Sequence, residues 1–305
     1  MQDSAVVEIN ELQREAAEGA RQISKANSVA VRRSFIARPS QDAAPPPMAM
    51  MLRGSGGRAG TVRLKLYLSL LWLARKSDRP AYHFASREWA VLLGLPAPEA
   101  AGARRINDAL RWLEEQAFVR LERKRGAPTT VHLLDDGGSG ELYHPPGMLL
   151  VQKRPKLPDS ERQKHYYVQF SADFWLDGWV TKLTGPAVAM YLVLLHQQTM
   201  SHSDLLWISP SLTKARYDLS EDTRNKGLRE LVEQGLATLE RQPLRSGAFT
   251  GQGRTRNAYR ITDLASNKAK LNQELGSDAR RQFEGTFHQP SDIRTLMRQQ
   301  SLYTP

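Results

Sequence analysis

The sequence predicts an α+β fold that is mainly helical and contains one small unit used twice. The prediction rests on a motif that occurs twice and on the helix and strand patterns on either side of it. In both places the motif connects a third helical pattern to two strand patterns. Of the 305 residues, 40% are hydrophobic and six are tryptophan, which is enough apolar side chain to build cores.

The repeated motif lies at the end of the third expected helix of each unit. It reads Leu-x-x-Leu-x-Glu-Gln-x-Phe/Leu-x-x-Leu-Glu-Arg and begins at Leu110 and at Leu228, an offset of 118 residues. Upstream, Tyr-Leu-x-Leu-Leu begins at Tyr67 and at Tyr191, an offset of 124. A longer loop at residues 96–102 of the first copy explains the difference of six. We interpret the pairs as one fold used twice, and chance similarity between leucine-rich helices is the alternative.

The first unit is expected to contain three helices followed by a hairpin. Helical patterns cover residues 61–75, 86–95 and 101–116, with a short extended piece at residues 82–84 and a cap at Ser86. Two strands follow at residues 118–124 and 129–134, separated by a Gly-Ala-Pro turn.

The second unit repeats this order. A strand at residues 166–170 opens it, and Pro186 stands at the first position of its first helix, where a missing N–H does no harm. Ser220 caps the third helix, and the two acidic residues after it favour the helix N-terminus. Strands at residues 237–244 and 257–262 close the unit as a hairpin.

The polar and proline-rich stretches predict the domain organisation. We expect a flexible N-terminal arm and linker at 1–52, a first unit at 53–135, a connector at 136–165, a second unit at 166–265 and a helical C-terminal tail at 266–305. The two units are expected to be separate domains.

Three helices, the third running directly into a β-hairpin, resemble the winged helix-turn-helix. The phrase Leu-x-x-Leu-x-Glu-Gln-Gly-Leu that begins at Leu228 is similar to sequences at the exit of the recognition helix in that family. A tandem pair also resembles plasmid replication initiators, and the segments at 207–210 and 217–223 are similar to ones in plasmid-borne initiators and regulators. The resemblance implies that the third helix enters the major groove of DNA and that the hairpin, or wing, contacts the flanking backbone.

The helical period predicts which side chains of the third helices face outward. A step of 100° per residue puts Ile106, Leu110 and Leu113 on one face of the first helix, which must be core. The opposite faces of the two helices then carry residues suited to DNA, because Arg pairs with guanine and Asn with adenine through two hydrogen bonds. These residues are Arg104, Asn107 and Arg111 in the first helix and Asn225, Lys226 and Arg229 in the second. An ordinary solvated helix face is the alternative.

The hairpins add positive charge, which the resemblance would place on phosphates or in the minor groove. We expect contacts from Arg123, Lys124 and Arg125 in the first hairpin and from Arg245, Arg254 and Arg256 in the second. Strand alternation sends about half of such side chains to the other face, so the hairpin tips are the better candidates.

The charge balance favours a polyanionic partner. Lys and Arg number 43 against 32 Asp and Glu, giving a net charge of +11. Binding phosphates releases condensed counterions, so double-stranded DNA is the expected partner, with a homodimer or higher oligomer on DNA left open. There is no cysteine, no secretory signal is visible and no stretch is apolar enough to span a bilayer, so we expect a cytoplasmic protein, associated with the nucleoid or a plasmid, with no membrane partner.

Enzyme patterns are weak, and we expect no enzyme, no cofactor and no metal. The glycine-rich stretch at 54–59 resembles a dinucleotide fingerprint but lacks the following strand and acidic residue, so a hinge is preferred. The spacing of His196 and His202, near Asp204, suits neither a helix face nor a ligand pair.

Two hypotheses follow. The first is a sequence-specific DNA-binding protein of a plasmid or other mobile element, acting in replication initiation, transcription or partition. The second is a winged-helix scaffold for protein assembly whose DNA contact is non-specific. The basic hairpins and the matched Arg and Asn residues favour the first.

Overall fold

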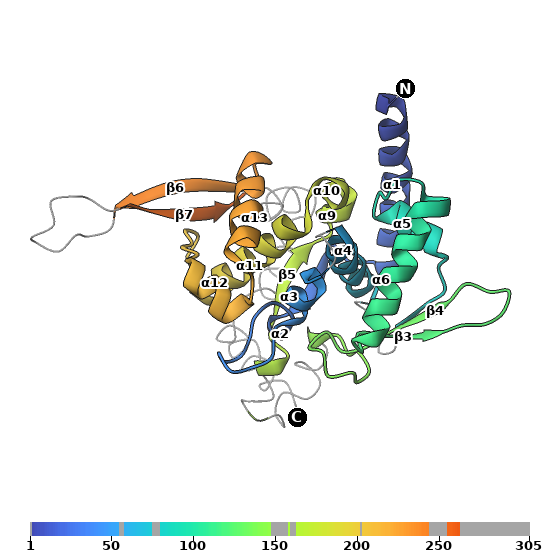
Figure 1. The fold of residues 1–305 in the computed structure, drawn as a ribbon, viewed down its shortest axis with the longest axis horizontal. Helices are drawn as coiled ribbons and strands as arrows, with labels where there is room; N and C mark the ends of the chain where they lie inside the picture. Colours follow the sequence, from blue (N-terminus) through green and yellow to red (C-terminus); the bar gives the residue numbers. More distant parts are fainter. Residues whose placement is uncertain are drawn as a thin grey trace, which may run out of the picture.

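The computed structural model describes residues 2–54, 58–74, 80–147, 158, 163–201, 203–243 and 255–262, and side chains from residue 11 onward. The fold is α+β, with helices around short antiparallel sheets (Figure 1). The expected C-terminal tail, residues 266–305, lies outside the described residues. Over the described part of the chain, no helix combines the length and the apolar character needed to cross a membrane.

Unit one (53–135) folds in the order helix, strand, helix, helix, hairpin. β2 pairs with β4 and β4 with β3, so the hairpin of β3 and β4, here hairpin one, belongs to a three-stranded sheet. The extra residues of this unit form a π-helical turn, Pro98–Gly102, in front of the third helix. The elements are α4 (Arg58–Leu73), β2 (Ala81–Tyr82), α5 (Ser86–Leu92), α6 (Ala103–Glu115), β3 (Val119–Glu122) and β4 (Thr130–Leu133).

Unit two (166–265) repeats the same order. Its hairpin of β6 and β7, here hairpin two, pairs from Ala237–Ile261 at the base to Pro243–Thr255. A single bridge between Leu206 and Tyr259 occupies the place that β2 holds in unit one. The elements are α11 (Gly185–Ser201), α12 (Pro210–Tyr217), α13 (Glu221–Glu233), β6 (Ala237–Pro243) and β7 (Thr255–Ile261).

The helix caps agree with expectation in unit two and differ in unit one. Ser220 caps α13, because its Oγ accepts a hydrogen bond from the N–H of Thr223 at 3.1 Å. In α5 the capping position is Ala85 rather than Ser86, and the Glu88 carboxylate accepts the N–H of Ala85 at 2.5 Å. This is the glutamate half of a capping box, and alanine supplies no side-chain acceptor for the other half.

The prediction of a flexible N-terminal arm is wrong for the part that the structure describes. The segment forms α1 (Gln2–Ser24), β1 (Ser28–Arg32), α2 (Arg33–Ile36) and α3 (Pro47–Leu52). Val29, Val31, Phe35 and Met48 are fully buried. β1 pairs antiparallel with β5 (Tyr167–Ser171), the strand that opens unit two, and Ala30 stands opposite Gln169 at the centre of both strands.

α1 lies against both units (Figure 1). The buried amide of Gln13 donates hydrogen bonds to the carbonyl of Leu92 at 3.4 Å and to that of Trp175 at 3.0 Å. Leu92 ends α5, and Trp175 belongs to α9 (Asp173–Leu176). One side chain of α1 therefore connects a helix end of unit one to a helix end of unit two.

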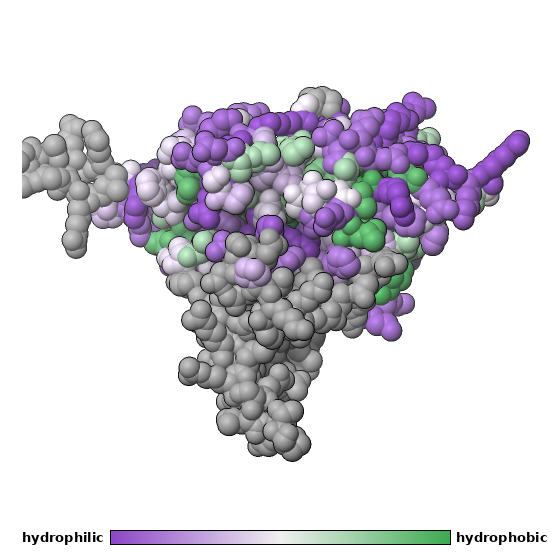
Figure 2. Space-filling model, turned by 90° about the horizontal axis from the view of Figure 1, so that it is seen from below, coloured by the Kyte–Doolittle hydropathy of each residue, from purple (hydrophilic) through white to green (hydrophobic). Residues whose placement is uncertain are grey.

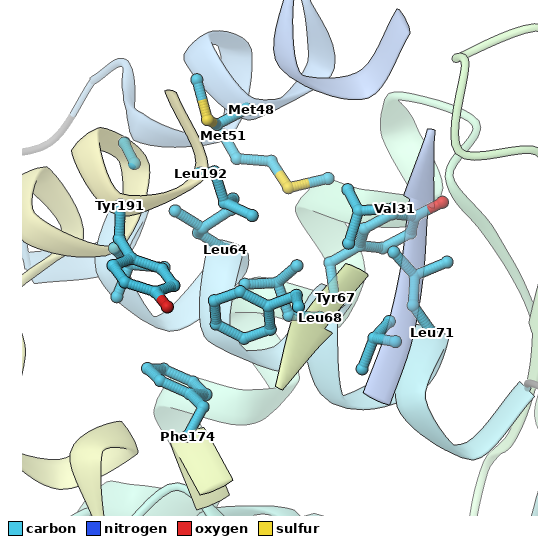
Figure 3. Packing of buried hydrophobic residues seen from close by; sticks show 14 of the residues in the cluster. Val31, Met48, Met51, Leu64, Tyr67, Leu68, Leu71, Phe174, Tyr191 and Leu192 are labelled. Atoms are coloured by element: carbon cyan, nitrogen blue, oxygen red, sulfur yellow. The ribbon is translucent and has the colours of Figure 1, made fainter. Parts of the chain in front are cut away.

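The core is continuous across the two units, and α4 is at its centre. Figure 3 shows Leu64 and Leu68 of α4 among side chains of α3, β1, α9 and α11, including Met48, Tyr191 and Leu192. The two units therefore share apolar side chains instead of each closing a core of its own.

Aromatic contacts strengthen this junction. Trp72 of α4 stacks on Trp175 with ring centroids 4.6 Å apart. Each indole N–H is satisfied, that of Trp72 by the carbonyl of Ala26 and that of Trp175 by Ser69 Oγ. These bonds tie the N-terminal segment and α9 to the same helix.

The start of the expected connector, 136–165, is also part of the folded body. Asp136 is fully buried and forms an ion pair with Arg32, whose side chain is 2% exposed. Arg32 also donates from its backbone N–H to Asp136 at 3.2 Å and from Nη2 to the carbonyl of His144 at 2.5 Å. The ring of Tyr143 lies 5.5 Å from the Arg32 guanidinium. The chain leaving hairpin one is thus fastened to the end of β1.

A buried lysine lies where the units meet. Lys65 of α4 is 6% exposed, and its Nζ donates to the carbonyl of Val180 in α10 (Trp179–Lys182). Burial lowers the pKa of Lys65 to about 8, an effect that Glu230 opposes and Arg105 reinforces.

We expect the free energy of unfolding to rise by about 2 kcal/mol between pH 8 and pH 10 through Lys65. Over this range the folded protein releases the proton of Lys65, while the unfolded chain, with an ordinary lysine pKa of 10.5, still holds most of it. The buried tyrosines have raised pKa values, so the ionisation of tyrosine in the unfolded chain begins to oppose this trend as the pH approaches 10, and the difference between the two proteins isolates the contribution of Lys65. Urea unfolding at pH 8, 9 and 10 measures the rise, and Lys65→Met should lack it. The same pH slope in both proteins would contradict the prediction.

Candidate nucleic-acid interface

The third helices, α6 and α13, lie on opposite sides of the central helices α4 and α11, and the two hairpins project in opposite directions (Figure 1). Each third helix buries the face predicted from its apolar spacing, with Ile106, Leu110 and Leu113 buried in α6 and Leu228 and Leu231 in α13. The opposite face of each helix is therefore directed away from the core.

The predicted residues of both helices are exposed, as expected. They are Arg104, Asn107 and Arg111 in α6 and Asn225, Lys226 and Arg229 in α13. The structure therefore presents two matched sets, each with an Asn and, four residues later, an Arg on the same outward face.

In unit one, the location of α6 is fixed by aromatic packing and by a close approach at a glycine. Trp89 of α5 is buried against Phe84, with centroids 5.4 Å apart and the rings edge to face. Gly102 permits close approach at the start of α6, because a Cβ there would lie 3.1 Å from the side chain of Ala90.

A different set of contacts positions α13 in unit two. A Cβ on Gly227 would lie 2.3 Å from the carbonyl oxygen of Pro186, so only glycine lets α13 pack this closely on α11. In α12, the hydroxyl of Tyr217 bonds to His196 Nδ1 at 2.9 Å and accepts from Gln197 Nε2 at 2.6 Å. Burial lowers the pKa of His196 to about 3, an effect that Arg216 and Arg33 reinforce, so the imidazole is neutral and structural.

Within the described residues, each asparagine forms one side-chain hydrogen bond. Ser86 Oγ donates to Asn107 Oδ1 at 2.5 Å, and Arg224 Nη1 donates to Asn225 Oδ1 at 2.6 Å. Arg224 is itself held by the carbonyl of Ile208 at 3.0 Å. In both cases the amide oxygen faces a protein donor, and the amide NH2 group is left to find an acceptor.

The cations of these faces also have partners on their own helices. Arg111 lies 3.6 Å from Asp108, Lys226 lies 2.9 Å from Asp222, and Arg229 lies 3.7 Å from Glu233. All six side chains are more than half exposed, so each pair contributes at most about 1 kcal/mol. Exposed pairs of this kind exchange readily with another anion.

Hairpin one carries the basic cluster that the sequence predicted. Arg123, Lys124 and Arg125 are all exposed, and Figure 2 shows strongly hydrophilic residues over the hairpin that projects at the right of the view. Arg123 pairs with Glu114 of α6 at 2.7 Å and Lys124 with Glu122 at 3.0 Å. Among the described residues, Arg125 and Arg104 form no ion pair, so these two carry uncompensated positive charge.

Hairpin two is described along both of its strands, but residues 244–254 between them lie outside the described residues. Arg256 is partly buried, stacks 5.0 Å from the centroid of Trp207 and donates to Gln242 Oε1 at 3.2 Å. Arg245 and Arg254 lie outside the described residues. Trp207 is 51% exposed, an unusual state for tryptophan, and the sequence reasoning assigned it no role at this surface. Trp207 lies three residues before the start of α12, within the segment 207–210 that carries part of the resemblance.

The histidine pair of the sequence does not form part of a metal-binding cluster in the described residues. Within the described ranges no group of three or more His, Cys, Asp or Glu side chains is placed to hold a metal ion. His196 is occupied by Tyr217, and His202 lies outside those ranges. The glycine-rich stretch lies partly outside the described residues, at 55–57.

Comparison with protein families and curated sequences finds no relative. No protein-family model matches the chain, and no curated protein sequence is similar to it. The chemistry of the site is therefore argued from its own residues.

We expect Arg111→Ala and Arg229→Ala each to change the free energy of unfolding by less than about 0.5 kcal/mol, because their ion pairs are exposed. Gly227→Ala, on the buried side of α13, should cost about 1–3 kcal/mol because its Cβ meets the carbonyl of Pro186. Urea unfolding of the three variants checks this. If Arg229→Ala destabilises as much as Gly227→Ala, the arginine has a structural role.

Proposed function

We propose that the protein binds double-stranded DNA sequence-specifically through two winged helix-turn-helix units, with α6 and α13 entering major grooves. The observation that carries the proposal is the pair of matched outward faces, Asn107 with Arg111 and Asn225 with Arg229. Two copies of one unit that expose the same residue types at the same positions favour a shared ligand with two similar sites.

The chemistry of these faces suits base edges. Arginine can donate two hydrogen bonds to guanine, and the amide NH2 of each asparagine, which has no acceptor among the described residues, can donate to a purine N7 or to a phosphate. The ion pairs that hold the arginines are weak enough to be replaced, because their partners are exposed.

The hairpins support the same function through charge. Hairpin one ends in three consecutive exposed cations, and the chain as a whole has a net charge of +11. Contacts of this kind bind phosphates of any sequence and fix the register of the protein on the duplex. In this scheme the helices supply specificity and the hairpins supply most of the affinity.

The biological setting that fits this proposal is a plasmid or another mobile element, where the protein acts as an initiator of replication or as a regulator of transcription or partition. The support is the tandem arrangement of the units and the resemblance of the segments at 207–210 and 217–223.

One observation favours a second candidate, a scaffold that binds protein. Three of the predicted contact residues on the helices, Arg111, Lys226 and Arg229, are already paired with acidic residues, and this lowers the positive potential of α6 and α13. A scaffold would use these mixed-charge faces for protein contacts and would bind DNA without sequence preference.

Selection from a library of random duplexes, followed by a salt series on the selected site, tests the proposal. We expect a defined site, and an affinity that falls roughly 10³-fold or more between 50 and 200 mM salt if six to ten phosphates are contacted. Random duplex of the same length is the control and should bind more weakly at every salt concentration. Equal affinity for both duplexes would support the scaffold instead.

Replacement of the matched arginines tests which side chains recognise sequence. Arg111→Ala and Arg229→Ala should each cost about 1–3 kcal/mol on the selected site and less on random duplex, because base contacts are lost only on the selected site. Arg125→Ala, in hairpin one, is the matched control and should weaken both duplexes nearly equally. Binding titrations on both duplexes give the specificity ratio. An unchanged ratio in both helix variants would show that α6 and α13 are not the elements that recognise bases.

A further inference from the structure

The turn between α12 and α13 contains a buried carboxylate. Asp218 has φ of +51° and a side chain that is 3% exposed. Lys214 of the same unit lies 3.1 Å from its Oδ1. A carboxylate this deeply buried needs partners that stay in place, because removing its charge from water costs several kcal/mol.

The other two partners of Asp218 come from the N-terminal segment. Arg38 Nη2 lies 3.2 Å from Asp218 Oδ1, and Arg53 forms an ion pair with Oδ2. Backbone contacts reinforce the first of these, because the N–H of Arg38 donates to the carbonyl of Arg216 at 2.8 Å. The helix-turn-helix of unit two is therefore fastened to the residues on either side of α3.

Arg53 continues the connection into unit one. Its carbonyl accepts a hydrogen bond from Arg63 Nη1 of α4 at 3.2 Å. The guanidinium of Arg63 lies over the indole of Trp112, 4.5 Å from its centroid, and Trp112 belongs to α6. A chain of polar contacts thus runs from the turn before α13, through Asp218, Arg53 and Arg63, to α6.

We infer that this chain sets the orientation of α6 relative to α13 and thereby the length of DNA that must separate the two halves of the binding site. The packing of α4 on α11 includes one hydrogen bond, from the N–H of Gly185 to Thr61 Oγ1 at 3.1 Å, but packed helices can still shift past one another by small amounts. Ion pairs and hydrogen bonds are directional, so they fix one arrangement. Arg53, Arg63 and Asp218 are positioning residues here, since they act through the helices.

This inference rests on the proposed function, and DNA geometry makes it testable. One inserted base pair moves one half of a site by about 3.4 Å along the duplex and turns it by about 35°. A rigid pair of helices cannot follow that rotation, while a loosened pair can follow part of it.

The first experiment measures affinity for the selected site with its central spacer changed by −1, 0, +1 and +2 base pairs. The unmodified protein should lose roughly tenfold or more with each single-base-pair change. Arg53→Gln should lose less than about threefold, and Arg53→Lys, which keeps a cation for Asp218, should restore the steep dependence. Arg53 is 54% exposed, and Asp218 keeps Arg38 and Lys214, so the variant should fold normally, as its melting temperature will show.

Arg58→Gln is the matched control. It removes an exposed arginine five residues away that has no described ion pair, and it should keep the dependence of the unmodified protein. A spacer dependence in Arg53→Gln as steep as in the unmodified protein would overturn the inference.

The second experiment needs no DNA. The chain has no cysteine, so Asp108→Cys in α6 and Glu233→Cys in α13 give two unique sites for nitroxide labels. Pulsed electron paramagnetic resonance should show one narrow distance distribution, which broadens in Arg53→Gln and narrows again in Arg53→Lys. An unchanged distribution overturns the inference, and so does a broadened distribution with an unchanged spacer dependence. If no DNA site is selected at all, the proposed function fails, while this measurement still decides whether the polar chain orients the helices.

Discussion

The ion pair of Arg32 with Asp136 is the contact on which the arrangement of the chain depends. Arg32 ends β1, and Asp136 follows hairpin one, so the pair joins the N-terminal segment to the exit of unit one. The neighbouring strand β5 opens unit two and pairs with β1 along its whole length. Three separate parts of the sequence therefore meet at one buried cation. Without Asp136, Arg32 would keep only the less buried Asp135 as an anionic partner, 3.3 Å away, and without Arg32 the buried Asp136 would lose its described cation, which is far more costly than the pair.

Much of each unit could be predicted because its signals are local. Helical spacing identified α4, α6, α11 and α13, and alternation identified both hairpins, to within a few residues at their ends. The N-terminal segment was misjudged because its partners are distant in sequence. β1 has only five residues, and its buried valines become intelligible only beside β5. Buried polar residues such as Gln13 and Arg32 resemble surface residues until the carbonyls and carboxylate that satisfy them are known.

In the candidate site, too, features with local signals could be predicted and contacts between distant residues could not. The outward direction of Asn107, Arg111 and their counterparts followed from a step of 100° per residue, and the structure agrees. Contacts between elements could not be predicted, among them Ser86 with Asn107 and Arg224 with Ile208. Arg224 stands where the other unit has Ile106, and its donation to the Ile208 carbonyl explains why a cation is accepted there. Trp207 beside Arg256 was missed because exposure of an aromatic side chain cannot be derived from spacing.

The pairing of β1 with β5 has a consequence for synthesis of the protein on the ribosome. The two strands are separated by about 140 residues of sequence, and such non-local pairing is slow to form. At 5–20 residues per second, β1 leaves the ribosome roughly 7–30 seconds before its partner is made. During that interval the residues of β1, including Val29 and Val31, lack the strand they pair with in the folded protein. Until residue 171 has emerged, we expect the nascent chain to be more prone to aggregation than the complete protein.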